Sequence, residues 1–217
     1  MMNSKGLLTI TIILLISLTS CRFWGVRGSG DIESEKREVN DFQEIEISGA
    51  YEVDIFVGEK TGVELSGDDN LLKYIDTYVR GNTLVIESRK DLKPRKGIKI
   101  KITTPELEVL SLSGASDVFI EGLDEGRFYL DMSGACSIEA EGIVGTFKLE
   151  LSGAGSVNAR HLKAEDVVVS ISGASSASVY ASNSLDASVS GVGSVSYYGD
   201  PEYVDTDVSG IGSINRK

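Results

Sequence analysis

Between residues 110 and 217, hydrophobic and polar residues alternate in short stretches, and each stretch ends at a Ser-Gly pair. In the stretch 147–151, for example, Phe147, Leu149 and Leu151 occupy alternate positions. A period of two is the signature of a β-strand with one buried face. Comparable stretches precede all six Ser-Gly pairs of this region, so the pattern predicts an all-β fold.

The Ser-Gly pair recurs six times, each time followed by a small or apolar residue, and a seventh copy lies upstream. The glycines of the six copies are spaced 20, 19, 20, 18 and 19 residues apart. This period is shorter than that of helical-hairpin repeats and fits one coil of a β-helix. We therefore predict a single-stranded β-helix with coils of about 19 residues. The predicted turn glycines are Gly49, Gly114, Gly134, Gly153, Gly173, Gly191 and Gly210.

The repeated turn residues are expected to be architectural. Neighbouring coils lie about 4.8 Å apart, so a Cβ at each glycine would crowd the turn of the next coil. Glycine also permits backbone conformations with positive φ. Any function must then reside in the residues that do not repeat, either on the outward faces or at an open end of the solenoid.

The chain before the repeats divides into two parts. Residues 38–109 contain further alternating stretches and are predicted to form a β-strand region continuous with the solenoid at 110–217. These strands should cap the N-terminal end, because a terminal repeat has to cover an exposed edge. Residues 21–37 are polar and contain several glycines, which predicts a flexible tether.

The first residues resemble a targeting signal. Lys5 precedes an apolar run over 7–18 that is too short for a permanent membrane anchor, which takes about 20 apolar residues. Small residues directly before Cys21 resemble the bacterial lipobox, so we predict a lipoprotein signal peptide over 1–20 and acylation of Cys21. The alternative is an ordinary signal peptide cut nearby. Arg22 differs from the Asp-type inner-membrane retention signal, which favours the outer membrane of a bacterial cell envelope, with the domain in the periplasm or at the cell surface.

Composition and charge narrow the classes of partner. With 41% hydrophobic and 25% charged residues the chain has the composition of a folded protein. Its formal net charge is −12, and removal of residues 1–20, which hold one Lys and no acid, makes it −13. Nucleic acid is excluded as a partner, because phosphate binding requires a basic surface. After acylation of Cys21, Cys136 is the only thiol left, so no intramolecular disulfide is expected.

Several motifs together resemble a known family. These are the stretch 39–54, the segments 71–75 and 105–108, and the run of Ser-Gly-Ala turns. They are similar to the auto-transporter adhesin "head GIN" domain family over roughly residues 36–217. The resemblance implies a secreted or lipid-anchored bacterial protein with a β-helical fold. It supplies no catalytic or binding residues.

Candidate chemistry is sparse. Asp131 and Glu150 are predicted to face outward on adjacent coils about 5 Å apart, which is compatible with a retaining glycosidase pair or a weak cation site. A solvated face is the simpler interpretation. His161 is the sole histidine, so a His/Cys metal site lacks a second nitrogen ligand. We therefore predict no catalytic residues, no metal, no cofactor and no enzymatic activity.

The outward surface remains as the place for binding. One outward row of mostly uncharged residues is suited to contact with glycan or an envelope protein through hydroxyl and amide groups. Tyrosines crowd the last coils, where they either stack on sugar rings or shield the open end. Two alternatives stay open: a structural protein that self-associates through the solenoid end, and a carbohydrate-active enzyme acting on acidic polysaccharide. The candidate binding residues are Glu139, Asn158, Tyr180, Tyr198 and Tyr203.

Overall fold

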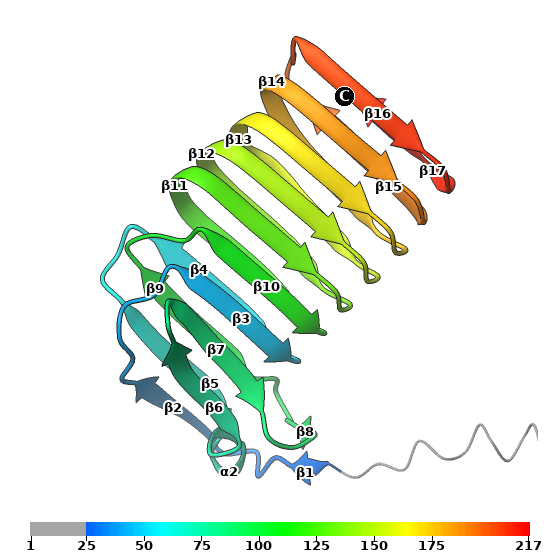
Figure 1. Ribbon diagram of the computed structural model, residues 1–217. Coiled ribbons are helices and arrows are strands. Elements are labelled where there is room, and N and C mark those ends of the chain that lie inside the picture. Colours follow the sequence, from blue (N-terminus) through cyan, green and yellow to red (C-terminus); the bar gives the residue numbers. More distant parts are fainter. Residues whose placement is uncertain (1–24) are drawn as a thin grey trace, which may run out of the picture.

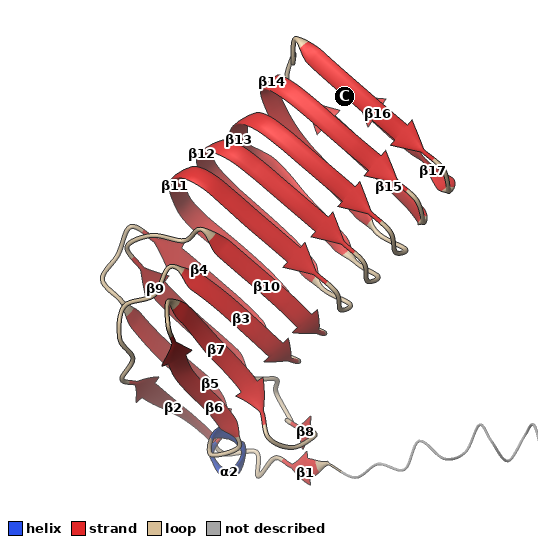
Figure 2. Cartoon of the chain, viewed as in Figure 1, coloured by secondary structure: helices blue, strands red, loops and turns tan. Residues whose placement is uncertain are grey.

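The computed structural model describes residues 25–217 of the chain. Strands account for 69% of it and helix for 2%, and parallel coils stack into a β-solenoid of about five turns with about 20 residues per turn. The predicted β-helix is thereby confirmed (Figure 1, Figure 2). The predicted signal peptide 1–20 and Cys21 lie outside the described residues.

Each coil has two walls that meet at a Ser-Gly turn. We call the strands that enter the turns the first wall and the strands that leave them the second wall. Four long strands each leave a turn along the second wall, bend, and return along the first wall to the next turn. All neighbouring strands in this part of the solenoid pair in parallel. The four long strands are β11 (Asp117–Met132), β12 (Ser137–Leu151), β13 (Ser156–Ile171) and β14 (Ser176–Val189). The shorter strands of this part are β10 (Val109–Gly114), β15 (Val192–Tyr198), β16 (Tyr203–Val208) and β17 (Ile211–Arg216).

Inward side chains of both walls form one continuous hydrophobic core. Leu130 and Leu149 are register partners on the first wall and are fully buried. The rings of Phe128 and Phe147 stack with centroids 5.9 Å apart. Burying each such side chain stabilises the fold by about 1.5–3 kcal/mol. The buried cluster spans residues 42–195, so this part of the chain carries a core of its own.

The turns leave no room for a side chain at the glycine. A Cβ built on Gly153 would lie 1.8 Å from the carbonyl oxygen of Gly134 in the preceding coil. The next residue, Ala154, donates its backbone N–H to that same oxygen at 3.0 Å. The coils therefore approach through their backbones, and this contact rather than a positive φ requires glycine at Gly153.

The strand order at the N-terminal end differs from the sequence order. The seventh Ser-Gly copy connects β3 (Glu44–Gly49) to β4 (Glu52–Val57), and Gly49 pairs with Gly114 in the register of β3 and β10. The next coil outward is made by the later strands β7 (Thr83–Ser88) and β9 (Lys99–Thr104). The chain thus first builds the inner coil and then returns to build the outer one (Figure 1).

Antiparallel strands close this end and confirm the predicted cap. β6 pairs with β7, β5 pairs with β9, and β2 pairs with β5. A single helical turn, α2, connects β5 to β6, and a short parallel pair, β1 and β8, lies beside it (Figure 1). The bounds are β1 (Val26–Arg27), β2 (Ile32–Arg37), β5 (Gly62–Asp68), α2 (Asp69–Leu72), β6 (Ile75–Arg80) and β8 (Leu92–Lys93).

The expectation of a flexible tether over 21–37 is wrong for its described part. Residues 32–37 form β2, with a continuous antiparallel register against β5 from Ile32–Asp68 to Arg37–Val63. Polar and glycine-rich composition suggested a linker, but the open edge of β5 offers backbone hydrogen bonds that do not depend on apolar side chains. The described fold therefore begins well before Glu38.

Candidate functional site

The second wall presents an outward row of register partners. We call this row the second-wall ladder. Its members occur at equivalent positions of successive coils, and most are half-buried because their neighbours above and below cover them. They are Phe119, Glu139, Asn158, Ser178, Ser196 and Asn215.

Two predicted binding residues of this ladder are in direct contact. Asn158 donates its side-chain N–H to Oε1 of Glu139 at 3.0 Å. The two side chains come from adjacent coils and align because β12 and β13 pair in register at this point. Because Oδ1 of Asn158 is buried, the half-buried carboxylate of Glu139 is the group of this pair that can accept hydrogen bonds from sugar hydroxyls.

Two predicted tyrosines continue the same wall. Tyr180 and Tyr198 are register partners, and each lies two residues beyond a ladder serine, which places both on the same outward face. Nζ of Lys163 lies 3.7 Å from the centroid of the Tyr180 ring, a cation–π contact that holds this ring in place. The second wall therefore combines a polar pair with an aromatic pair.

Tyr203 lies elsewhere. It begins β16 on the first wall, pairs in register with Ser184 and is 63% exposed. It borders a surface hollow of about 530 Å³ that Asp186 and Asp205 also line. The five predicted binding residues thus do not form one surface: four lie on the second wall and Tyr203 on the first.

The first wall carries the carboxylate pair. Asp131 and Glu150 are register partners on adjacent coils, as expected. The two oxygens of Glu150 are occupied, because Nζ of Lys148 lies 2.8 Å from Oε1 and the hydroxyl of Tyr129 donates to Oε2 at 2.8 Å. Nζ of Lys148 also lies 5.0 Å from the centroid of the Tyr129 ring. Glu150 is therefore already engaged by two neighbours.

Titration of this cluster follows from those contacts. Hydrogen bonds from Lys148 and Tyr129 lower the pKa of Glu150. Burial, reinforced by the charge of Glu150, raises the pKa of Asp131. Burial and the hydrogen bond to Glu150 raise the pKa of Tyr129 to about 12. Opposite shifts in two carboxylates are typical of acid–base pairs, and here they follow from the burial of Asp131 and from the contacts of Glu150 with Lys148 and Tyr129.

Metal ligands do not gather in the described chain. Within residues 25–217 no group of three or more His, Cys, Asp or Glu side chains is placed to hold a metal ion. His161 is exposed and pairs in register with Glu141. Cys136 is buried in a turn. In the same range, no helix has the length and apolar character needed to cross a bilayer.

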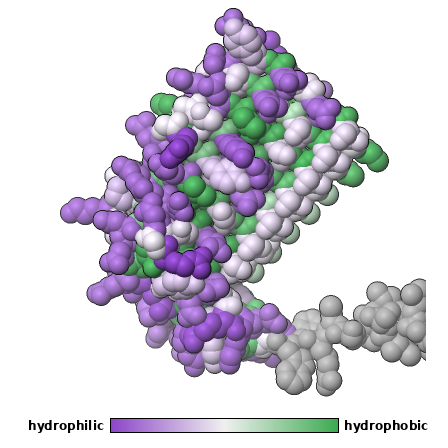
Figure 3. All heavy atoms as spheres, viewed as in Figure 1, coloured by the Kyte–Doolittle hydropathy of each residue, from purple (hydrophilic) through white to green (hydrophobic). Residues whose placement is uncertain are grey.

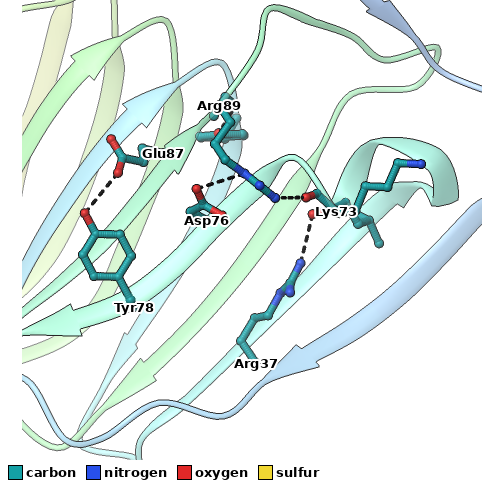
Figure 4. A network of polar contacts seen from close by, with 9 residues as sticks. Arg37, Lys73, Asp76, Tyr78, Glu87 and Arg89 are labelled. Atoms are coloured by element: carbon teal, nitrogen blue, oxygen red, sulfur yellow. Dashed lines mark hydrogen bonds and ion pairs between the residues drawn. The ribbon is translucent and has the colours of Figure 1, made fainter.

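A polar network at the N-terminal end was missed by sequence reasoning (Figure 4). Arg37 donates from Nη2 to the carbonyl oxygen of Leu72 at 3.0 Å, and Arg89 donates to the carbonyl of Lys73. Arg89 also pairs with Asp76 through Nε at 3.0 Å. Two arginines thus hydrogen-bond to the carbonyls of Leu72 and Lys73 at the end of α2. Counting charge segment by segment would have revealed the basic character of this end.

The surface of the N-terminal end differs from that of the repeated coils. Hydrophilic side chains cover the N-terminal end, and a pale row of small residues runs along the solenoid over the turns (Figure 3). The fold and these walls define a β-solenoid repeat protein. The chain belongs to the family described as putative auto-transporter adhesin, head GIN domain, which matches residues 41–201. Membership of this adhesin-like family indicates a surface or envelope protein.

Solved structures share the fold. A putative adhesin from Bacteroides fragilis NCTC 9343 is 26% identical, with a TM-score of 0.71 and coverage of 89% of this chain and 100% of that chain. A putative lipid binding protein from Parabacteroides distasonis ATCC 8503 is 24% identical, with a TM-score of 0.53 and coverage of 88% and 99%. A putative adhesin from the same organism is 18% identical, with a TM-score of 0.55 and the same coverage. No curated protein matches the chain.

Proposed function

We propose that the protein is a non-enzymatic, lipid-anchored adhesin of the bacterial outer membrane that binds glycan through its second wall. The observation that carries this proposal is the joining of a polar pair and an aromatic pair on one rigid face. Glu139 supplies a carboxylate that the amide of Asn158 holds in place, and Tyr180 and Tyr198 supply rings on which sugars stack. Because these groups stand on paired strands of stacked coils, they are positioned before a ligand arrives, which lowers the entropic cost of binding.

A glycan array probed with residues 22–217 tests the binding face. The double variant Tyr180→Ala with Tyr198→Ala should lose at least about tenfold in affinity for any glycan that the unchanged chain binds. Tyr203→Ala is the matched control, because it removes an exposed tyrosine from the other wall. Equal losses in both variants, or no glycan bound by the unchanged chain, would contradict the proposal.

The anchor is tested separately in cells. Cys21→Ser should release the protein from the membrane fraction and abolish incorporation of labelled fatty acid. Cys136→Ser is the control, since Ser116 and Ser175 occupy the equivalent buried turn position in other coils and the change should be tolerated. Continued labelling of Cys21→Ser would overturn acylation at that residue.

Self-association is a second candidate function, favoured by exposed apolar side chains on the last described coil. Val204 and Val208 continue the inward rows of β14 but remain 46% and 42% exposed, and Ile211 is 78% exposed. The last coil also presents an open strand edge, and open strand edges pair readily with another copy of the same chain. Sedimentation velocity over a wide concentration range is the test, and a strictly monomeric protein would remove this candidate.

A further inference from the structure

The N-terminal end of the solenoid carries positive charge in an otherwise acidic protein. Segment 89–96 has five basic residues and one acid, a net charge of +4, whereas the chain carries −12, which leaves −16 for the remaining residues. Such segregation points to a separate partner for the basic end. The basic residues of this segment are Arg89, Lys90, Lys93, Arg95 and Lys96, and its acid is Asp91.

Folding adds cations from other parts of the chain to this segment. Lys73 and Lys90 place Nζ 5.3 and 4.5 Å from the centroid of the same Tyr74 ring, so two ammonium groups contact one aromatic ring. Arg27 is the register partner of Lys93 in the pair of β1 and β8. Lys73 follows α2, Arg27 belongs to β1 and Lys93 to β8, and these three elements lie at the same end of the solenoid (Figure 1).

The acids at this end neutralise only part of the charge. Asp76 pairs with Arg89, and the carboxylate of Asp68 is buried. Asp31, Glu33, Asp69 and Asp91 are exposed, and the exposed Glu35 pairs with Arg37 at 3.1 Å. Among the described residues, no carboxylate pairs with any member of a set of three exposed lysines, which we call the basic face. The set consists of Lys73, Lys90 and Lys96.

The basic face lies where the chain arrives from Cys21. β1 begins at Val26 and donates from its backbone N–H to the carbonyl of Asp91 at 2.8 Å, inside the basic segment. Only three residues separate Cys21 from Gly25, so the contour length of the chain keeps Gly25 within about 14 Å of Cys21. An acylated Cys21 would therefore hold the basic face close to the bilayer surface.

We infer that the basic face docks on an anionic lipid surface and orients the solenoid away from the membrane. Anionic headgroups attract juxtamembrane Lys and Arg within roughly one Debye length, about 8 Å at physiological salt. The remaining acidic surface is repelled by the same headgroups. Contact at the N-terminal end, with the solenoid axis pointing outward, is the arrangement that satisfies both forces and leaves the second wall accessible.

This inference deepens the proposed envelope location, but its test does not require the lipid anchor. Residues 22–217, which lack Cys21, are mixed with vesicles of an equal mixture of phosphatidylglycerol and phosphatidylcholine, or of phosphatidylcholine alone, and sedimented. Binding should occur on the anionic vesicles only and fall steeply with added salt. The triple variant Lys73→Gln, Lys90→Gln and Lys96→Gln should bind at least about tenfold more weakly.

A matched control separates this face from net charge. Arg127→Gln, Arg160→Gln and Lys217→Gln remove the same charge from exposed residues outside the N-terminal end, and should leave vesicle binding within about twofold. Equal weakening in both triple variants, or binding to neutral vesicles as well, would overturn the inference. Binding to soluble heparin without binding to anionic vesicles would assign the face to a soluble polyanion instead. If the vesicle assays fail, the Cys21→Ser experiment still tests the lipid anchor independently.

Discussion

At the N-terminal end of the solenoid, strands β2, β5 and β6 run antiparallel to their neighbours, and individual side chains hold the segments together. Asp68 is fully buried and accepts N–H groups from Gly30 at 2.6 Å and Arg95 at 2.9 Å. A Cβ on Gly28 would lie 2.3 Å from the same carboxyl group. This end depends on contacts that occur once.

In the repeated body the corresponding task is performed by backbone. Each turn donates one N–H to the glycine carbonyl of the coil before it, at 2.7–3.0 Å between Ala135 and Ile211. Among the described residues, no further coil lies on the last one, and all residues of β16 are exposed. The comparison shows that specific side chains hold the N-terminal end together, whereas small turn residues hold the repeated coils together by letting their backbones approach.

The largest effect is expected from filling a turn in the repeated body. Gly153→Ala should lower the free energy of unfolding by roughly 3 kcal/mol or more, because its Cβ would overlap the carbonyl oxygen of Gly134. Gly126→Ala is the control, since nothing lies within 4 Å of its Cβ position. Urea denaturation measures both. Similar values for the two variants would show that the backbone contact does not limit the turn.

The second effect concerns the closed end. Asp68→Ala should lower the free energy of unfolding by about 2 kcal/mol, because the buried N–H groups of Gly30 and Arg95 lose a charged acceptor. Trypsin should then cleave after Arg27 or Arg37 more rapidly than in the unchanged chain. Asp31→Ala alters an exposed carboxylate of the same segment and should leave cleavage unchanged.

The third prediction compares equivalent inward positions in a middle coil and in the last coil. Val167→Ala should cost about 2 kcal/mol, since Val167 is 1% exposed and its loss leaves a cavity. Val204 occupies the same row but is 46% exposed, and Val204→Ala should cost less than about 0.5 kcal/mol. Thermal unfolding measures both. A large loss in Val204→Ala would show that the last coil is covered in solution.

The smallest effect concerns the first-wall carboxylates. The pKa of Asp131 is raised in the folded state, so its ionisation disfavours folding above that pKa. Asp131→Asn should therefore stabilise the protein at pH 7, by less than about 1 kcal/mol because the group is partly solvated. The gain should vanish below the ordinary carboxyl value of 3.8, where Asp131 is protonated in both states. Asp207→Asn in the same row is the control for a simple change of net charge.

The sequence predicted which residues of the second-wall ladder align between coils, but not which of the candidate binding residues share one wall. The spacing of the repeats aligned Glu139 with Asn158, because positions one coil apart become neighbours in a solenoid, whereas the pairing of Tyr180 with Tyr198 came from the structure. Tyr203 was grouped with them because it is close in sequence, whereas the bend after Tyr198 carries the chain to the other wall. The exclusion of nucleic acid rested on total charge, which does not reveal a basic segment inside an acidic chain.

The sequence by itself determined the strands, the turns and the coil length of this protein. These features are local: alternation within a strand and glycine at a fixed spacing depend on near neighbours and on the distance between coils. The tertiary structure alone decided the order of the coils and the fate of the first residues. β7 and β9 lie outside β3 and β4, and residues 32–37 form a strand. Both arrangements arise because the unpaired backbone N–H and C=O groups of an open strand edge have to be satisfied by another segment of backbone.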